Sequence, residues 1–87
     1  MTNNYNELIN IFASITNKDE MKKFLEEILT DKERISITLR WQLMKDINSG
    51  KSQREIASEH HLSLCKITRG SKILKSPNSI CKKYLNQ

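Results

Sequence analysis

The side chains best suited to chemistry lie in residues 52–74, where the sequence predicts two short helices joined by a tight turn. The second helix turns a polar and basic face outward, formed by Ser63, Cys65, Lys66, Thr68 and Lys72. A short helix with such a face can enter the major groove of DNA, where its side chains meet the edges of the bases. The pattern therefore predicts a helix-turn-helix that binds double-stranded DNA.

Local signals position this pair of helices. Ser52 and Glu55 have the spacing of a capping box, which predicts that the first helix begins at this point. Ser63 is placed to cap the second helix in the same way. The inward sides of the two helices are apolar and are formed by Ile56, Ala57, Ile67 and Leu74. The alternative interpretation is an ordinary helical hairpin with a solvated polar face.

The predicted turn, His60-His61-Leu62, departs from the usual pattern of such motifs. Turns of this kind prefer glycine at the position of His61, because φ is often positive there. His60, His61 and Cys65 lie close together in the sequence, but a metal site would need a second pair of ligands, so none is predicted. Cys65 and Cys81 have no redox or metal spacing, and reduced thiols in a cytoplasmic protein are expected.

Charge is distributed unevenly along the 87 residues, whose net charge is +5. Residues 1–49 hold seven Lys and Arg against eight Asp and Glu, whereas residues 50–87 hold eight against two. The excess positive charge therefore accompanies the predicted helix-turn-helix and favours a polyanionic partner. No acid–base pair, activated nucleophile or phosphate-binding loop stands out, so an enzyme is not expected. Neither a signal peptide nor a membrane span is expected.

Apolar spacing predicts an all-α fold of six short helices in a single domain, residues 1–87. Capping boxes at Asn17 and Thr30 begin the second and third helices, and Gly50 ends the third. Ser76 is expected to cap the last helix, with Pro77 in its first turn. The third helix carries two apolar stripes, formed by Ile35, Leu39, Leu43 and Ile47 and by Ile37, Trp41 and Met44. Burial on two sides predicts a homodimer whose helices cover each other.

Residues 28–75 resemble the Trp repressor family. The resemblance depends on Leu29, Thr30, Glu33, Arg34 and Arg40, on Gly50 with Ser52-Gln53-Arg54-Glu55, and on Ile67-Thr68-Arg69-Gly70-Ser71 with Leu74-Lys75. It implies an intertwined dimer in which the fourth and fifth helices form a DNA-reading head on each side. It also implies a corepressor, L-tryptophan or an indole-type analogue, and a palindromic operator as the DNA partner.

The resemblance further assigns individual residues. It places the corepressor between Arg40 and Arg69, with room left by Gly70 and with Thr30 of the partner subunit nearby. Ile73 aligns with a family serine that helps to hold the ammonium group of the ligand, so the ligand could instead be an indole acid without an amine. The chain is also one residue shorter than the family pattern between Arg40 and Ser52, which shifts the register of the third helix.

The DNA contacts implied by the resemblance begin at the fourth helix, where Gln53 and Arg54 would touch phosphates or a guanine at the groove edge. Lys75 would meet the DNA backbone. The groove would be lined by Leu64, Cys65, Lys66 and Thr68. Two other functions stay open at this point: a ligand-independent helix-turn-helix module of the same fold, and a helical protein-interaction domain that uses the face around Trp41.

Overall fold

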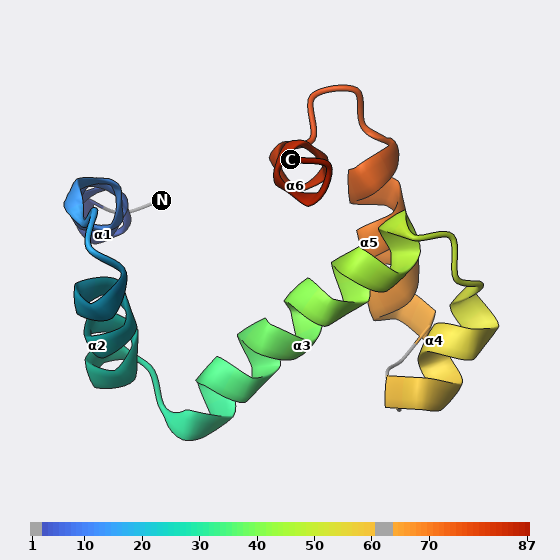
Figure 1. Cartoon of the computed structure of the whole chain (residues 1–87), viewed down its shortest axis with the longest axis horizontal. Helices are drawn as coiled ribbons and strands as arrows, with labels where there is room; N and C mark the ends of the chain where they lie inside the picture. The colour runs from blue at the N-terminus through green and yellow to red at the C-terminus, as the bar shows by residue number, and fades with distance from the viewer. Residues whose placement is uncertain (1–2, 61–63) are drawn as a thin grey trace. The chain divides into compact units, whose positions relative to one another are not determined.

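The computed structural model describes residues 3–60 and 64–87. These residues form six helices and no strand, which confirms the predicted all-α fold (Figure 1). The helices are α1 (Asn3–Ser14), α2 (Lys18–Ile28), α3 (Asp31–Asn48), α4 (Gln53–His60), α5 (Leu64–Lys75) and α6 (Ile80–Leu85). The chain divides into two compact units, Met1–Ser36 and Ile37–Gln87, with the boundary inside α3. The single domain stays a prediction.

The first unit is organised by two helix caps that the sequence predicts. Asn17 Oδ1 accepts a hydrogen bond of 2.9 Å from the backbone N–H of Glu20 at the start of α2. At the start of α3, Thr30 Oγ1 accepts from the N–H of Glu33 at 3.2 Å, and the Glu33 carboxylate accepts from the N–H of Thr30 at 2.9 Å. These backbone and side-chain bonds with Thr30 lower the pKa of Glu33.

Contacts between helices in the first unit are few. Phe12 of α1 meets Phe24 of α2 edge to face, with ring centroids 5.3 Å apart. The Arg34 guanidinium bonds to the carbonyls of Leu29 at 2.7 Å and Glu26 at 3.2 Å, and so satisfies the C-terminal end of α2. Neither α1 nor α2 contains a buried residue. Because α1 and α2 are strongly amphipathic and hold no buried residue, their apolar sides need another apolar surface to cover them.

The second unit has a small apolar core between α3, α4 and α5. Ile56 and Ile67 are fully buried, and Leu43 packs against them at 4% exposure. Gly70 of α5 lets this helix lie close to α3, because a Cβ at Gly70 would come within 3.0 Å of Ile47 Cδ1. These contacts confirm the inward sides predicted for α4 and α5, and Leu74 is buried as well.

Local conformation sets the ends of the helices in this unit. Gly50, two residues beyond the end of α3, has a φ of 95°, as expected for a glycine that ends a helix. Ser52 Oγ accepts a 3.1 Å bond from the N–H of Glu55 at the start of α4. The prediction for the last helix was wrong: Ser79, not Ser76, caps α6 by accepting from the N–H of Lys82 at 3.1 Å. Pro77 instead lies in a turn closed by the Ser79 N–H and the Ser76 carbonyl, where its fixed φ fits equally well.

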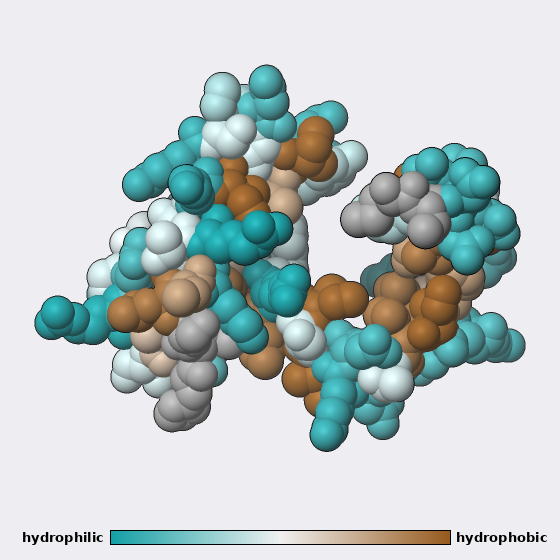
Figure 2. Space-filling model, turned by 180° about the vertical axis from the view of Figure 1, so that it is seen from behind, coloured by the Kyte–Doolittle hydropathy of each residue, from teal (hydrophilic) through white to brown (hydrophobic). Residues whose placement is uncertain are grey.

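Large apolar side chains are open to solvent in both units, and Figure 2 shows apolar patches at the surface. On α3 they include residues of both predicted stripes: Ile35, Ile37, Leu39 and Trp41 are 59%, 54%, 38% and 43% exposed, whereas Leu43, Met44 and Ile47 of the same stripes are buried or half-buried. Others are Tyr5, Ile9, Ile11, Ile28, Leu64, Ile80 and Tyr84. Within the described residues, no helix has both the length and the apolar character needed to cross a membrane.

Candidate functional site

The outward face of α5 is polar and basic, as predicted. Cys65, Thr68 and Lys72 are exposed and recur at intervals of three and four residues, so they form one stripe along the helix. Lys75 and Leu64 are exposed near the two ends of α5, and Gln53 and Arg54 are exposed in the first turn of α4. Ser63 lies outside the described residues, as do His61 and Leu62 of the predicted turn, whereas His60 is the last residue of α4 and not part of a turn.

A second face of α5 borders a pocket of about 170 Å³ that α3 completes. Its lining side chains come from one face of each helix: Arg40, Leu43 and Met44 of α3, and Lys66, Arg69, Gly70 and Ile73 of α5. The pocket therefore brings together four of the five ligand residues implied by the family resemblance. Arg40 belongs to it despite the one-residue shortening that follows it in the sequence.

The chemistry of this pocket is cationic and apolar. Arg40, Lys66 and Arg69 supply three positive charges, while Leu43, Met44 and Ile73 supply apolar surface. No carboxylate is found among the described residues that line it. Guanidinium groups stack on aromatic faces and pair with carboxylates through two parallel hydrogen bonds. The pocket thus suits a flat apolar molecule that carries an acid group.

Sequence reasoning missed three lining residues and leaves one assignment open. Leu43 and Met44 follow Arg40 by three and four residues, and Lys66 precedes Arg69 by three, so helical spacing from the arginines could have found all three. Lys66, assigned to the groove face, borders the pocket as well. The predicted place of Thr30 beside the ligand concerns Thr30 of a partner subunit, so it stays a prediction.

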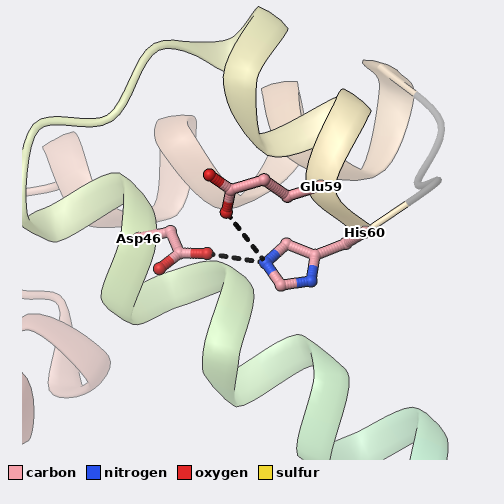
Figure 3. A group of neighbouring side chains, drawn as sticks. All are labelled: Asp46, Glu59 and His60. Atoms are coloured by element: carbon pink, nitrogen blue, oxygen red, sulfur yellow. Dashed lines mark hydrogen bonds and ion pairs between the residues drawn. The ribbon is translucent and has the colours of Figure 1, made fainter.

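Sequence reasoning also missed a buried carboxylate that joins α4 to α3. Asp46 of α3 is 5% exposed, and its carboxylate lies 2.8 Å from His60 Nε2 at the end of α4 (Figure 3). Gln42 Nε2 donates a second bond of 3.0 Å to Asp46. The Lys51 ammonium lies 3.7 Å from Asp46 and 2.9 Å from Glu59. This network fixes α4, and with it the position of α5, against α3.

The residue types in this network also resemble a metal site. One ligand atom each from Asp46, Glu59 and His60 lies within 4.8 Å of the others. However, the Lys51 ammonium already lies beside both carboxylates, and Asp46 has two further hydrogen-bond partners. A divalent cation would have to displace Lys51, so we interpret the group as a structural tie between helices.

This tie predicts a loss of stability in acid. Burial alone would raise the pKa of Asp46, but the hydrogen bonds from His60 and Gln42, together with the nearby charges of Lys51 and His60, lower the pKa below its usual value of 3.8. A lowered folded-state pKa gives stability that is present above about pH 4 and is lost as the pH falls through the folded value.

Replacing Asp46 by asparagine is therefore expected to reduce the free energy of unfolding by about 1–3 kcal/mol at pH 7, because it removes a buried charged acceptor. The difference from the parent protein should narrow as the pH falls below about 4. Urea unfolding at pH 7, 4 and 3 measures both effects, with Glu27→Gln, an exposed acid of α2, as the control. A difference that stays constant over this range would contradict the role of Asp46.

α5 thus carries a basic outward face and also borders a cationic pocket that it shares with α3. Comparison with known proteins gives the class of the chain. The family model described as Trp repressor protein matches residues 3–87. A Trp operon repressor homolog of Xylella fastidiosa (strain M23) is 39% identical over 72 residues, which cover 82% of this chain and 78% of the relative.

A second relative, a Trp operon repressor homolog of Chlamydia trachomatis serovar L2, is 31% identical over 81 residues, which cover 87% of this chain and 86% of the relative. No solved structure matches the chain. The chain is a repressor-type regulator by these comparisons. It belongs to the Trp repressor family, as the resemblance in residues 28–75 predicts.

Proposed function

We propose that the chain is a homodimeric DNA-binding repressor whose affinity for a palindromic operator depends on a small aromatic acid, tryptophan or an indole-type relative. The observation that carries the proposal is the pocket itself. Arg40 and Arg69 are far apart in the sequence, yet both line one pocket between α3 and α5. Two guanidinium groups beside apolar walls form a suitable receptor for an aromatic carboxylate.

DNA binding is supported by the outward face of α5. Its exposed thiol, hydroxyl and ammonium groups, Cys65, Thr68 and Lys72, can reach base edges, and Lys75 and Arg54 can reach phosphates. In helix-turn-helix dimers, of which the Trp repressor is a standard example, recognition helices enter major grooves about 34 Å apart. Both relatives are named Trp operon repressor homolog, which fits an operator as the partner.

The same helix can couple the two sites. A ligand wedged against Arg69 and Gly70 presses on α5 from its inner side, while the outward stripe on this helix faces the groove. The ligand would thus favour the orientation in which both heads of the dimer match successive grooves. Such coupling is a population shift, and it requires only that the ligand bind more tightly to the DNA-competent orientation.

The test is a titration of palindromic operator-type DNA with the protein, with and without L-tryptophan or an indole acid, at several salt concentrations. Affinity is expected to fall by orders of magnitude between roughly 50 and 200 mM salt, because Lys and Arg release counterions from phosphates. Lys72→Ala with Lys75→Ala should weaken binding and lower the slope of log K against log salt by about one for each phosphate that is no longer neutralised.

The matched control removes the same two charges from α2, as Lys22→Ala with Lys23→Ala, and should leave the slope unchanged. Binding that is insensitive to salt would argue against a DNA partner. Salt-dependent binding that no indole acid changes would indicate a ligand-independent helix-turn-helix module instead.

A further inference from the structure

We infer that Asp46 and His60 are positioning residues for DNA reading, because the bond between them fixes the N-terminal end of α5 relative to α3. The inference rests on the proposed function, since it concerns the helix proposed to enter the major groove. It goes further by assigning a role in DNA binding to two residues that lie outside both the pocket lining and the outward stripe of α5.

The place of His60 in the chain is the first argument. His60 ends α4, and α5 begins four residues later at Leu64. The Nε2 atom of His60 lies 2.8 Å from the Asp46 carboxylate, so the bond holds the chain to α3 just before α5 begins (Figure 3). In helix-turn-helix proteins the N-terminal residues of the recognition helix contact the base edges. The bond therefore acts near the end of α5 whose position decides which bases are met.

The second argument is the apolar character of the core that joins α3, α4 and α5. Leu43, Ile56 and Ile67 form its buried cluster, and Gly70 lies close to Ile47 in the middle of α5. Apolar burial is non-directional, so it brings helices together without fixing their rotation. A hydrogen bond weakens steeply when its angle becomes unfavourable, so it can fix the orientation that burial leaves free. The bond between α3 and the end of α4 supplies this direction.

The third argument is that the acceptor of this bond is both charged and buried. Asp46 is 5% exposed, and its lowered pKa keeps the carboxylate ionised at neutral pH. An ionised carboxylate can only accept hydrogen bonds, so His60 donates through its Nε2–H group. The Lys51 ammonium lies 3.7 Å from Asp46 and 2.9 Å from Glu59, and the Glu59 carboxylate lies 3.8 Å from the same imidazole nitrogen. If α4 moved away from α3, a buried charged acceptor would lose its donor, which is costly.

The experiment compares His60→Gln with His60→Asn in the full-length protein. The glutamine amide can donate from the place of Nε2, whereas the asparagine amide is one methylene shorter and does not reach Asp46. Palindromic operator-type DNA is titrated with each protein under the ligand condition in which the parent protein binds most tightly. Affinity is expected to fall about tenfold in His60→Asn and to stay within about threefold of the parent in His60→Gln, because a hydrogen bond to a charged group is lost in one and kept in the other.

Further measurements separate positioning from other causes. Asn17→Ala removes the cap of α2 and so lowers stability outside α4 and α5, and it should leave operator affinity unchanged. The slope of log K against log salt should be the same in both His60 variants and the parent, since no phosphate contact is lost. Nitrogen NMR of the parent protein needs no variant, and it should show that the neutral imidazole of His60 carries its proton on Nε2.

Equal operator affinity of His60→Gln and His60→Asn would overturn the inference and leave the proposed function intact. A lower salt slope in His60→Asn would do the same, because it would show that His60 contacts a phosphate directly. A neutral imidazole with its proton on Nδ1 would also overturn the inference, since His60 could not then donate to Asp46. A parent protein that binds no operator-type DNA even at low salt would instead refute the proposed function, and the inference with it.

Discussion

Replacing Ile37 by aspartate is expected to convert a dimer into separate chains that unfold at much lower temperature. Ile37 is 54% exposed in the single chain, and with Trp41 and Met44 it forms one of the two apolar stripes of α3. In a homodimer this stripe would be covered by the partner subunit. A carboxylate buried there without a counterion costs several kcal/mol, and the symmetry of the dimer places one at each of two equivalent positions.

The reason to expect a dimer is the small core of one chain. Among the described residues, the buried apolar side chains are Leu43, Ile56, Ile67 and Leu74, all in the second unit. The two helices of the first unit bury nothing. A chain of this length depends on extensive burial for its stability, so four buried side chains are too few. Covering the exposed stripes with a second copy would supply the missing apolar burial.

Sedimentation equilibrium and thermal unfolding over a range of protein concentrations measure this expectation. The parent protein should be dimeric at micromolar concentration, and its Tm should rise with concentration. Ile37→Asp should raise the dimer dissociation constant at least about a thousandfold, whereas Ser58→Asp, which adds the same charge at an exposed polar position of α4, should have little effect. A monomeric parent protein whose Tm is independent of concentration would exclude the dimer.

Local signals in the sequence predicted helix starts well where both residues of the cap stand three positions apart. The pairs Asn17–Glu20, Thr30–Glu33 and Ser52–Glu55 all form hydrogen bonds over three residues, so the sequence contains both partners. The failure at Ser76 and Pro77 has a physical cause as well. Proline fits both the first turn of a helix and the second position of a β-turn, and only the competing cap at Ser79 decides between them.

Contacts between helices were harder to predict, because spacing along one helix says nothing about which face of another helix it meets. The spacing of Lys66, Arg69 and Ile73 places them on one side of α5. That Arg40 lies on the opposite wall of the same pocket came from the family resemblance, not from the spacing. No family resemblance pointed to the bond between Asp46 and His60. Asp46 is nevertheless an acid close to the apolar residues Leu43 and Ile47 of α3, and an acid buried among apolar residues needs a polar partner.

Replacing Arg69 by alanine is expected to remove the response to ligand. Arg69 lines the pocket and belongs to the helix proposed to read DNA, so it can transmit binding at one site to the other. Hydrogen bonds to a charged group contribute enough that affinity for indole-3-propionate should fall roughly 10- to 100-fold. Arg69→Lys should recover part of the affinity, because an ammonium keeps the charge but cannot form two parallel bonds to the acid.

The loss of response must be separated from a loss of positive charge on α5. Lys75→Ala removes the same charge from the exposed end of the helix, so it should weaken DNA binding while the ligand still increases operator affinity. Arg69→Ala should instead bind operator DNA with the same affinity whether or not ligand is present. If that variant still binds DNA more tightly on adding indole-3-propionate or L-tryptophan, the ligand acts through a site other than the pocket between α3 and α5.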